Sequence, residues 1–77
     1  MKDYSRDVVK DENGELHLAV DEQHAEALNA FLVTWQIKCI RKQAGTETMN
    51  FDFGSGVSEE TLRTALSRCA ELHRPGV

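Results

Sequence analysis

The sequence predicts an α+β domain of ββαββα order, in which a four-stranded, mainly antiparallel sheet carries two helices on one face as a two-layer sandwich. Two observations support this fold class. Residues 34–42 and 47–53 alternate apolar and polar side chains on either side of a short turn, which is typical of a β-hairpin. The segments after Asp21 and after Ser58 repeat apolar residues with the 3.6-residue period of an amphipathic helix.

The length of the chain, 77 residues, allows one domain. We expect it over residues 6–73, between a frayed N-terminus (1–5) and a flexible tail (74–77). Nine basic and thirteen acidic residues give a net charge of −4, which weakly opposes binding to duplex nucleic acid. No apolar run approaches the roughly 20 residues that cross a bilayer, and no secretory signal is visible. We therefore expect a cytoplasmic protein without a membrane partner.

The N-terminal part of the chain predicts a first hairpin. Two adjacent valines precede a turn at residues 11–14, which ends in Asn-Gly, and residues 16–20 then alternate leucine or valine with histidine and alanine. We expect a four-residue loop with Gly14 in the left-handed conformation, which would pair Lys10 with Glu15.

The first helix is expected to begin after Asp21, whose carboxylate suits the N-cap position. Its apolar pattern reaches Trp35, and it can also be continued as one long central helix over residues 21–44 with Gly45 as its C-cap, which would leave a smaller sheet. The β-branched residues between positions 33 and 40 favour the strand instead. The hairpin is therefore the leading interpretation and the long helix its alternative.

The second hairpin is expected to turn at residues 43–45, a three-residue loop that ends in glycine. This register predicts the cross-strand pairs Trp35–Phe53, Ile37–Phe51, Cys39–Met49 and Arg41–Glu47. The last helix is expected to begin at Ser58, with two glutamates in its positive first turn.

Apolar residues on the predicted inner faces define the expected core. It comprises Leu16, Leu18, Val20, Leu28, Phe31, Leu32, Trp35, Ile37, Phe51, Phe53, Leu62, Leu66 and Cys69. The cysteines, Cys39 and Cys69, fall on apolar faces of a chain without an export signal, so we expect two reduced thiols.

The sheet face away from the helices is the expected functional surface, because apolar residues scattered among polar ones suit a transient or symmetric protein contact. This face should show Val8, His17, Ala19, Gln36, Lys38, Ile40, Thr48 and Asn50. The leading hypothesis is a small non-enzymatic interaction or regulatory module that binds another protein or itself. The candidate protein-binding residues are His17, Lys38, Ile40 and Lys42.

A second hypothesis is a nucleic-acid-binding regulator, because basic residues gather near the second hairpin and on the last helix. Its candidate residues are Lys38, Arg41, Lys42, Arg63 and Arg68. A third is a small-anion binder at the junction between the last strand and helix, where glycines and helix amides favour anions. The residues of that junction are Gly54, Ser55, Gly56 and Ser58.

The sequence predicts no metal, no cofactor and no catalytic residues. The three histidines and two cysteines lack the ligand pairs, two to four residues apart, that structural zinc sites usually show. Nucleophilic catalysis needs an activated side chain beside a base, and cysteines at core positions are inert.

Overall fold

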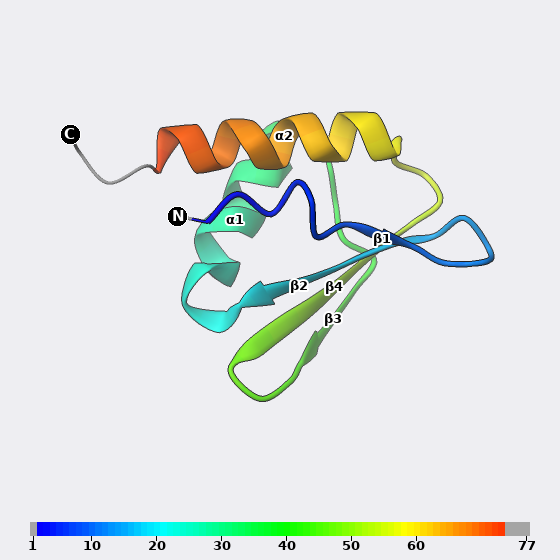
Figure 1. Ribbon diagram of the computed structural model, residues 1–77, viewed down its shortest axis with the longest axis horizontal. Helices are drawn as coiled ribbons and strands as arrows, with labels where there is room; N and C mark the ends of the chain where they lie inside the picture. The colour runs from blue at the N-terminus through cyan, green and yellow to red at the C-terminus, as the bar shows by residue number, and fades with distance from the viewer. Residues whose placement is uncertain (1, 74–77) are drawn as a thin grey trace.

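The computed structural model describes residues 2–73 and confirms the α+β fold (Figure 1). The predicted tail, 74–77, lies outside the described residues. The elements follow the order β1 (Val9–Lys10), β2 (Leu16–Asp21), α1 (Glu22–Thr34), β3 (Arg41–Ala44), β4 (Thr48–Gly54) and α2 (Glu59–Leu72).

The four strands form one antiparallel sheet in the order β1-β2-β4-β3, so that β2 and β4 are central and β1 and β3 are the edges. Helix α1 packs on both central strands, and α2 packs on α1, so both helices lie on one side of the sheet (Figure 1). The alternative of one helix over residues 21–44 is wrong, because α1 ends at Thr34.

The end of α1 is a Schellman motif with glutamine where glycine is usual. The N–H of Ile37 donates to the carbonyl of Leu32 at 2.9 Å, and the N–H of Gln36 donates to that of Val33 at 2.9 Å. Gln36 adopts the left-handed conformation, with a φ of 61°. Leu32 and Ile37, which the first of these hydrogen bonds joins, are both buried, and an apolar contact between these two positions often accompanies the motif. The motif turns the chain out of the helix and delays the next strand until Arg41.

The predicted register of the second hairpin is wrong, and none of its four pairs forms within the described chain. The observed partners are Arg41–Asp52, Lys42–Phe51, Gln43–Asn50 and Ala44–Met49. The turn lies at residues 45–47, not 43–45, with Glu47 at a φ of 62°. The alternation of apolar residues misled the prediction because Ile37 is buried from a loop and not from a strand.

The core confirms most of the predicted residues and corrects others. The prediction that Trp35 belongs to the core is wrong, because this residue is 38% exposed and lies beside the half-buried Phe31. Val8, expected on the outer face, is buried, as is Tyr4. The buried core comprises Tyr4, Val8, Leu16, Leu18, Val20, Ala25, Leu28, Leu32, Ile37, Phe51, Phe53, Leu62, Ala65, Leu66 and Cys69.

The N-terminal segment is anchored, which corrects the expectation of a frayed end at Tyr4. Its hydroxyl lies 2.9 Å from Nδ1 of His24 and accepts the backbone N–H of Asp21 at 3.2 Å. From α2, the guanidinium of Arg63 donates to the carbonyls of Ser5 at 2.7 Å and of Val8 at 3.4 Å. Sequence reasoning missed these contacts because they join positions far apart in the chain.

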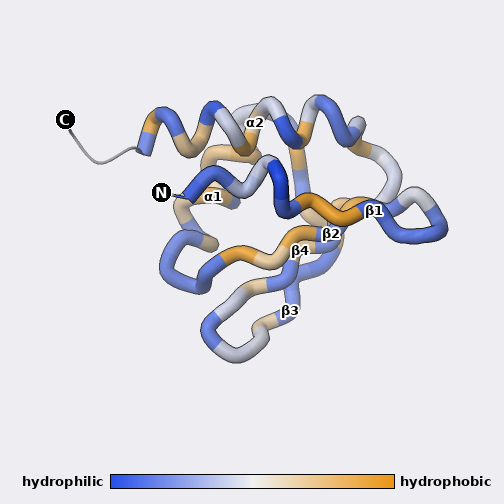
Figure 2. The backbone as a smooth tube through the Cα atoms, viewed as in Figure 1, coloured by the Kyte–Doolittle hydropathy of each residue, from blue (hydrophilic) through white to orange (hydrophobic). Residues whose placement is uncertain are grey.

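The first turn and the last helix largely follow expectation. Gly14 has a φ of 79°, as predicted, but Lys10 pairs with Leu16 and not with Glu15. This turn is a hydrophilic loop, and a hydrophobic stretch lies at the start of β1 before it (Figure 2). Ser58 caps α2, and its hydroxyl accepts the N–H of Thr61 at 3.5 Å.

Candidate functional site

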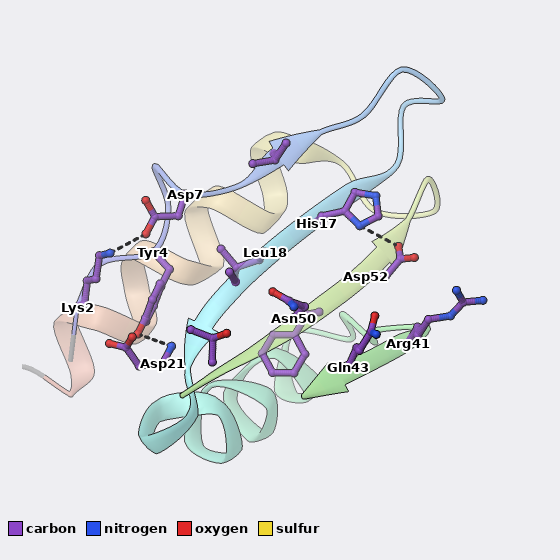
Figure 3. A pocket seen from close by; sticks show the side chains of 14 residues that line it. Lys2, Tyr4, Asp7, His17, Leu18, Asp21, Arg41, Gln43, Asn50 and Asp52 are labelled. Atoms are coloured by element: carbon purple, nitrogen blue, oxygen red, sulfur yellow. Dashed lines mark hydrogen bonds and ion pairs between the residues drawn. The ribbon is translucent and has the colours of Figure 1, made fainter. Parts of the chain in front are cut away.

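The side of the sheet away from the helices presents an open face built from two main rows of side chains (Figure 3). Strand residues alternate between faces, so that one row crosses all four strands and the next crosses three. The first row comprises Val9, His17, Asp52 and Arg41, and the second comprises Ala19, Asn50 and Gln43. The register therefore places residues from distant parts of the chain side by side.

His17 lies between two carboxylates at one end of the open face. Its Nε2 donates to Oδ2 of Asp11 at 2.8 Å, and its Nδ1 lies 3.8 Å from Oδ1 of Asp52. The hydrogen bond to Asp11, with the charge of Asp52 beside it, raises the pKa of His17 above its ordinary value. The same bond lowers the pKa of Asp11. The pair therefore favours a positive ring that faces a negative carboxylate.

A hollow of about 750 Å³ occupies the open face; we call it the open-face hollow. The N-terminal segment forms one wall, where Nζ of Lys2 lies 3.0 Å from Oδ2 of Asp7 and 5.4 Å from the centre of the Tyr4 ring. Arg41 and Gln43 of β3 form the opposite wall (Figure 3). The hollow thus reaches from the anchored N-terminus to the free edge of the sheet.

The chemistry of the open-face hollow is that of hydrogen bonding. The side-chain amides of Asn50 and Gln43 can each donate and accept, and both residues are exposed. Cations and carboxylates at the two walls can bind opposite charges on a ligand, and Val9, 60% exposed, adds apolar surface at the margin. The open face therefore combines hydrogen-bonding, charged and apolar groups.

The structure does not bring the four candidate protein-binding residues onto one face. His17 lies on the open face, as predicted, whereas Lys42 lines a smaller hollow of about 340 Å³ on the helix side. Lys38 is exposed in the loop before β3, and Ile40 is 69% exposed at the start of that strand. Lys42 therefore belongs to the β3 edge of the sheet, Lys38 and Ile40 belong to the segment that leads into it, and His17 lies apart from them on the central strand β2.

The candidate nucleic-acid residues lie at opposite edges of the sheet. Arg41 and Lys42 belong to the β3 edge, whereas Arg63 donates to carbonyls of the segment that leads into β1 and lies 3.6 Å from a Glu59 oxygen. Arg68 lies 4.0 Å from Glu71 on the exposed surface of α2. Only the part of this basic set near β3 forms a local group.

Two polar groups of the candidate anion site, the N–H of Gly54 and the hydroxyl of Ser58, have partners within the chain. The N–H of Gly54 donates to Oδ1 of Asp52 at 2.9 Å, and the hydroxyl of Ser58 accepts a helix amide. Gly54 is needed for another reason, because its φ is 67° and Cδ1 of Ile40 lies 3.0 Å from where a Cβ would be. Ser55 and Gly56 are exposed in the turn that follows.

One group of possible metal ligands occurs among residues 2–73. Asp11, Glu15 and His17 each place one ligand atom within 4.8 Å of the others. Asp11 is already used, however, because Oδ1 accepts the N–H groups of Asn13 and Glu15, both at 2.9 Å, and Oδ2 accepts from His17. Its carboxylate closes the first turn, which accounts for its position without a metal.

The thiols are part of the structural framework. Both cysteines are thiols, and burial raises the pKa of Cys69. Sγ of Cys39 lies 3.8 Å from Oδ1 of Asn29, which it reaches as a weak donor. The raised pKa of Cys69 disfavours the thiolate that nucleophilic catalysis uses.

Sequence reasoning placed His17, Ala19, Thr48 and Asn50 on the open face correctly. It missed Gln43, which it assigned to a turn, and the wall formed by Lys2 and Tyr4. A tyrosine close to a predicted frayed end was the one signal that could have revealed this wall, because buried tyrosine usually seeks a hydrogen-bond partner. Within residues 2–73, neither helix has the length and apolar character needed to cross a membrane.

No protein-family model, curated protein or solved structure matches this chain.

Proposed function

We propose that this chain is a non-enzymatic interaction module that binds another protein through the open face of its sheet and the adjoining β3 edge. The observation that carries the proposal is the open-face hollow, with its two walls and its amide-bearing floor. Hydrogen-bonding groups next to exposed apolar side chains are typical of non-obligate protein interfaces.

The two margins of the open face support the same proposal. Val9 in one edge strand and Ile40, directly before the other edge strand, are 60% and 69% exposed, and both offer apolar surface to a partner. Single exposed apolar residues are ordinary on a protein surface, so these two support the proposal only through their positions: Val9 lines the hollow, and Ile40 comes directly before β3.

We place the protein in the cytoplasm. Two thiols in a small domain, one of them fully buried, are typical of proteins in reducing compartments. The buried core extends from the N-terminal segment to α2, and this packing stabilises the domain without a disulfide.

Site-specific photo-crosslinking tests the proposal. A photoreactive residue at Asn50, in the middle of the open face, should give a defined crosslinked protein in cells that produce the chain. The same residue at Thr64, exposed on α2, is the matched control and should not give that product. A product of twice the mass of the chain would indicate self-association instead. Equal products from both positions, or none from Asn50, would contradict the proposal.

A further inference from the structure

The outward edge of β3 (Arg41–Ala44) is an unfilled position in the sheet. β3 is the last strand in the order β1-β2-β4-β3, and all four of its residues are exposed. Among residues 2–73, no further strand pairs with it. Such an edge offers backbone donors and acceptors to an extended chain.

The register identifies which backbone groups point outward. The N–H of Gly45 donates to the carbonyl of Thr48 at 2.8 Å, which makes these two residues a hydrogen-bonded pair. Bonded and non-bonded pairs alternate along an antiparallel ladder, so Gln43 is bonded to β4 as well. The N–H and C=O groups of Lys42 and Ala44 therefore face away from β4.

The start of β3 adds an irregularity that shapes this edge. The N–H of Ile40 donates to the carbonyl of Asp52 at 2.7 Å, although the ladder partner of Asp52 is Arg41. Two residues opposite one are a β-bulge, which twists an edge and limits the length of chain that can pair with it. The outward groups of Lys42 and Ala44 thus provide a short docking edge, with the exposed side chain of Ile40 at one end.

The charge of this edge is positive in a chain of net charge −4. Among the described residues, Lys38, Arg41 and Lys42 have no carboxylate within ion-pair distance. Asp52, opposite Arg41, instead accepts the N–H of Gly54. The two cations of β3, Arg41 and Lys42, and Lys38 in the preceding loop therefore have no ion-pair partner among the described residues and remain available to an external partner.

We propose that the β3 edge accepts an extended acidic segment of another protein as a fifth strand, an inference that rests on the proposed function and names its partner. Arg41 faces the open-face hollow and Lys42 faces the helix side. Side chains on neighbouring strands lie about 4.5–5.5 Å apart. Carboxylates at two successive positions of the added strand would therefore meet Arg41 on one face and Lys42 on the other.

A second copy of this chain fits the edge poorly. Pairing β3 with its own copy would bring Arg41 and Lys42 close to the same cations of the other chain, and like charges opposite each other destabilise a sheet. Lysine on an edge strand commonly prevents such self-pairing. The charges that exclude a second copy select an acidic segment.

Peptide binding tests this inference. The probe is a blocked, fluorescently labelled peptide, Thr-Val-Glu-Glu-Val-Thr, and its matched control carries lysine at both glutamate positions. At low ionic strength, fluorescence anisotropy should show that the lysine peptide binds at least about tenfold more weakly than the acidic peptide. Lys42→Gln should weaken the acidic peptide severalfold, whereas Lys10→Gln, on the opposite edge, should leave it unchanged. Equal binding of the two peptides would overturn the inference.

A backbone variant separates strand addition from simple charge attraction. Ala44→Pro removes an outward N–H and leaves the ladder with β4 in place, since proline is tolerated on edge strands at such positions. It should abolish peptide binding while the circular dichroism spectrum persists, and Ala44→Thr should bind normally. Unchanged binding by a folded Ala44→Pro would overturn strand addition.

The outcomes for the two proposals are distinguishable. A crosslinked partner at Asn50 without acidic-peptide binding would overturn strand addition and leave the interaction module intact. A sedimenting dimer that Ala44→Pro dissociates would overturn the acidic partner in favour of a second copy. Loss of both the crosslink and the peptide binding would overturn both proposals.

Discussion

The Tyr4 hydroxyl and Nδ1 of His24 lie 2.9 Å apart and join the N-terminal segment to the first turn of α1. The same hydroxyl accepts the N–H of Asp21, and its own proton is available for a hydrogen bond to an unprotonated Nδ1 of His24. Burial raises the pKa of Tyr4, which keeps that proton in place. This contact holds the wall of the open-face hollow that Lys2 and Asp7 complete.

Tyr4 should therefore contribute far more to stability than Trp35. Tyr4→Phe removes both hydrogen bonds of the hydroxyl and should lower the free energy of unfolding by about 1–2 kcal/mol. Tyr4→Ala also empties a core position and should cost roughly 3–5 kcal/mol. Trp35→Ala, at an exposed position, should cost within about 1 kcal/mol. Urea unfolding measures all three, and a larger loss for Trp35→Ala than for Tyr4→Ala would contradict the fold.

Gln36→Gly should stabilise the domain. Gln36 occupies the left-handed position that ends α1, where a side chain costs roughly 1–2 kcal/mol and glycine costs none. Part of this gain is offset by the greater freedom of glycine in the unfolded chain, so we expect about 0.5–1 kcal/mol. Gln43→Gly, within β3, is the control and should destabilise. A lower unfolding midpoint for Gln36→Gly would show that α1 ends differently.

Substitutions of Gly54 and Gly56, the two glycines between β4 and α2, should differ sharply in their effect on stability. Gly54→Ala places a Cβ on a backbone with a φ of 67° and 3.0 Å from the side chain of Ile40, and should destabilise by about 1–2 kcal/mol. Gly56→Ala meets nothing within 4 Å and should be nearly neutral or slightly stabilising. Thermal unfolding compares the two variants. Equal effects of the two substitutions on the unfolding temperature would contradict the left-handed conformation of Gly54 at the end of β4.

The contact between His17 and Asp11 should make stability depend on pH. The raised pKa of His17 adds stability that is complete below about pH 6.5 and is lost as pH rises through the raised value. The lowered pKa of Asp11 adds stability that is present above about pH 3.9 and is lost as pH falls through the lowered value. The pair therefore stabilises most between these two limits.

Unfolding midpoints of the wild type and His17→Gln, measured across the pH range, check this dependence. The difference between the two proteins should be largest between about pH 4 and 6.5 and should shrink above it. Asn13→Gln, a change in the same exposed turn, is the control and should show no such profile. A difference that stays constant with pH would mean that the imidazole and the carboxylate do not interact.

The sequence was sufficient for the element order, because periods of 2 and 3.6 residues separate strands from helices over most of the chain. It failed between Trp35 and Ile40, where a glutamine in a left-handed conformation ends α1 without the glycine that usually marks such an end. The apolar spacing of that loop resembles a strand because Ile37 must reach the core.

The open face was only partly predictable for the same reason. The positions of His17 and Asn50 follow from local alternation. The position of Gln43 depends on the strand register, in which Arg41 pairs with Asp52 and not, as predicted, with Glu47, five residues earlier. The wall at Lys2 and Tyr4 depends on contacts with Asp21 and His24, which no local pattern encodes. Long-range packing decides these positions.

Amide hydrogen exchange along β3 tests the central claim most directly. In the protein alone, the amides of Lys42 and Ala44 should exchange faster than that of Gln43, which is bonded to β4. Addition of the acidic peptide should slow the exchange of Lys42 and Ala44 and leave that of Gln43 nearly unchanged. Fast exchange at Lys42 and Ala44 with saturating peptide, or protection of both without it, would contradict an edge that receives a fifth strand.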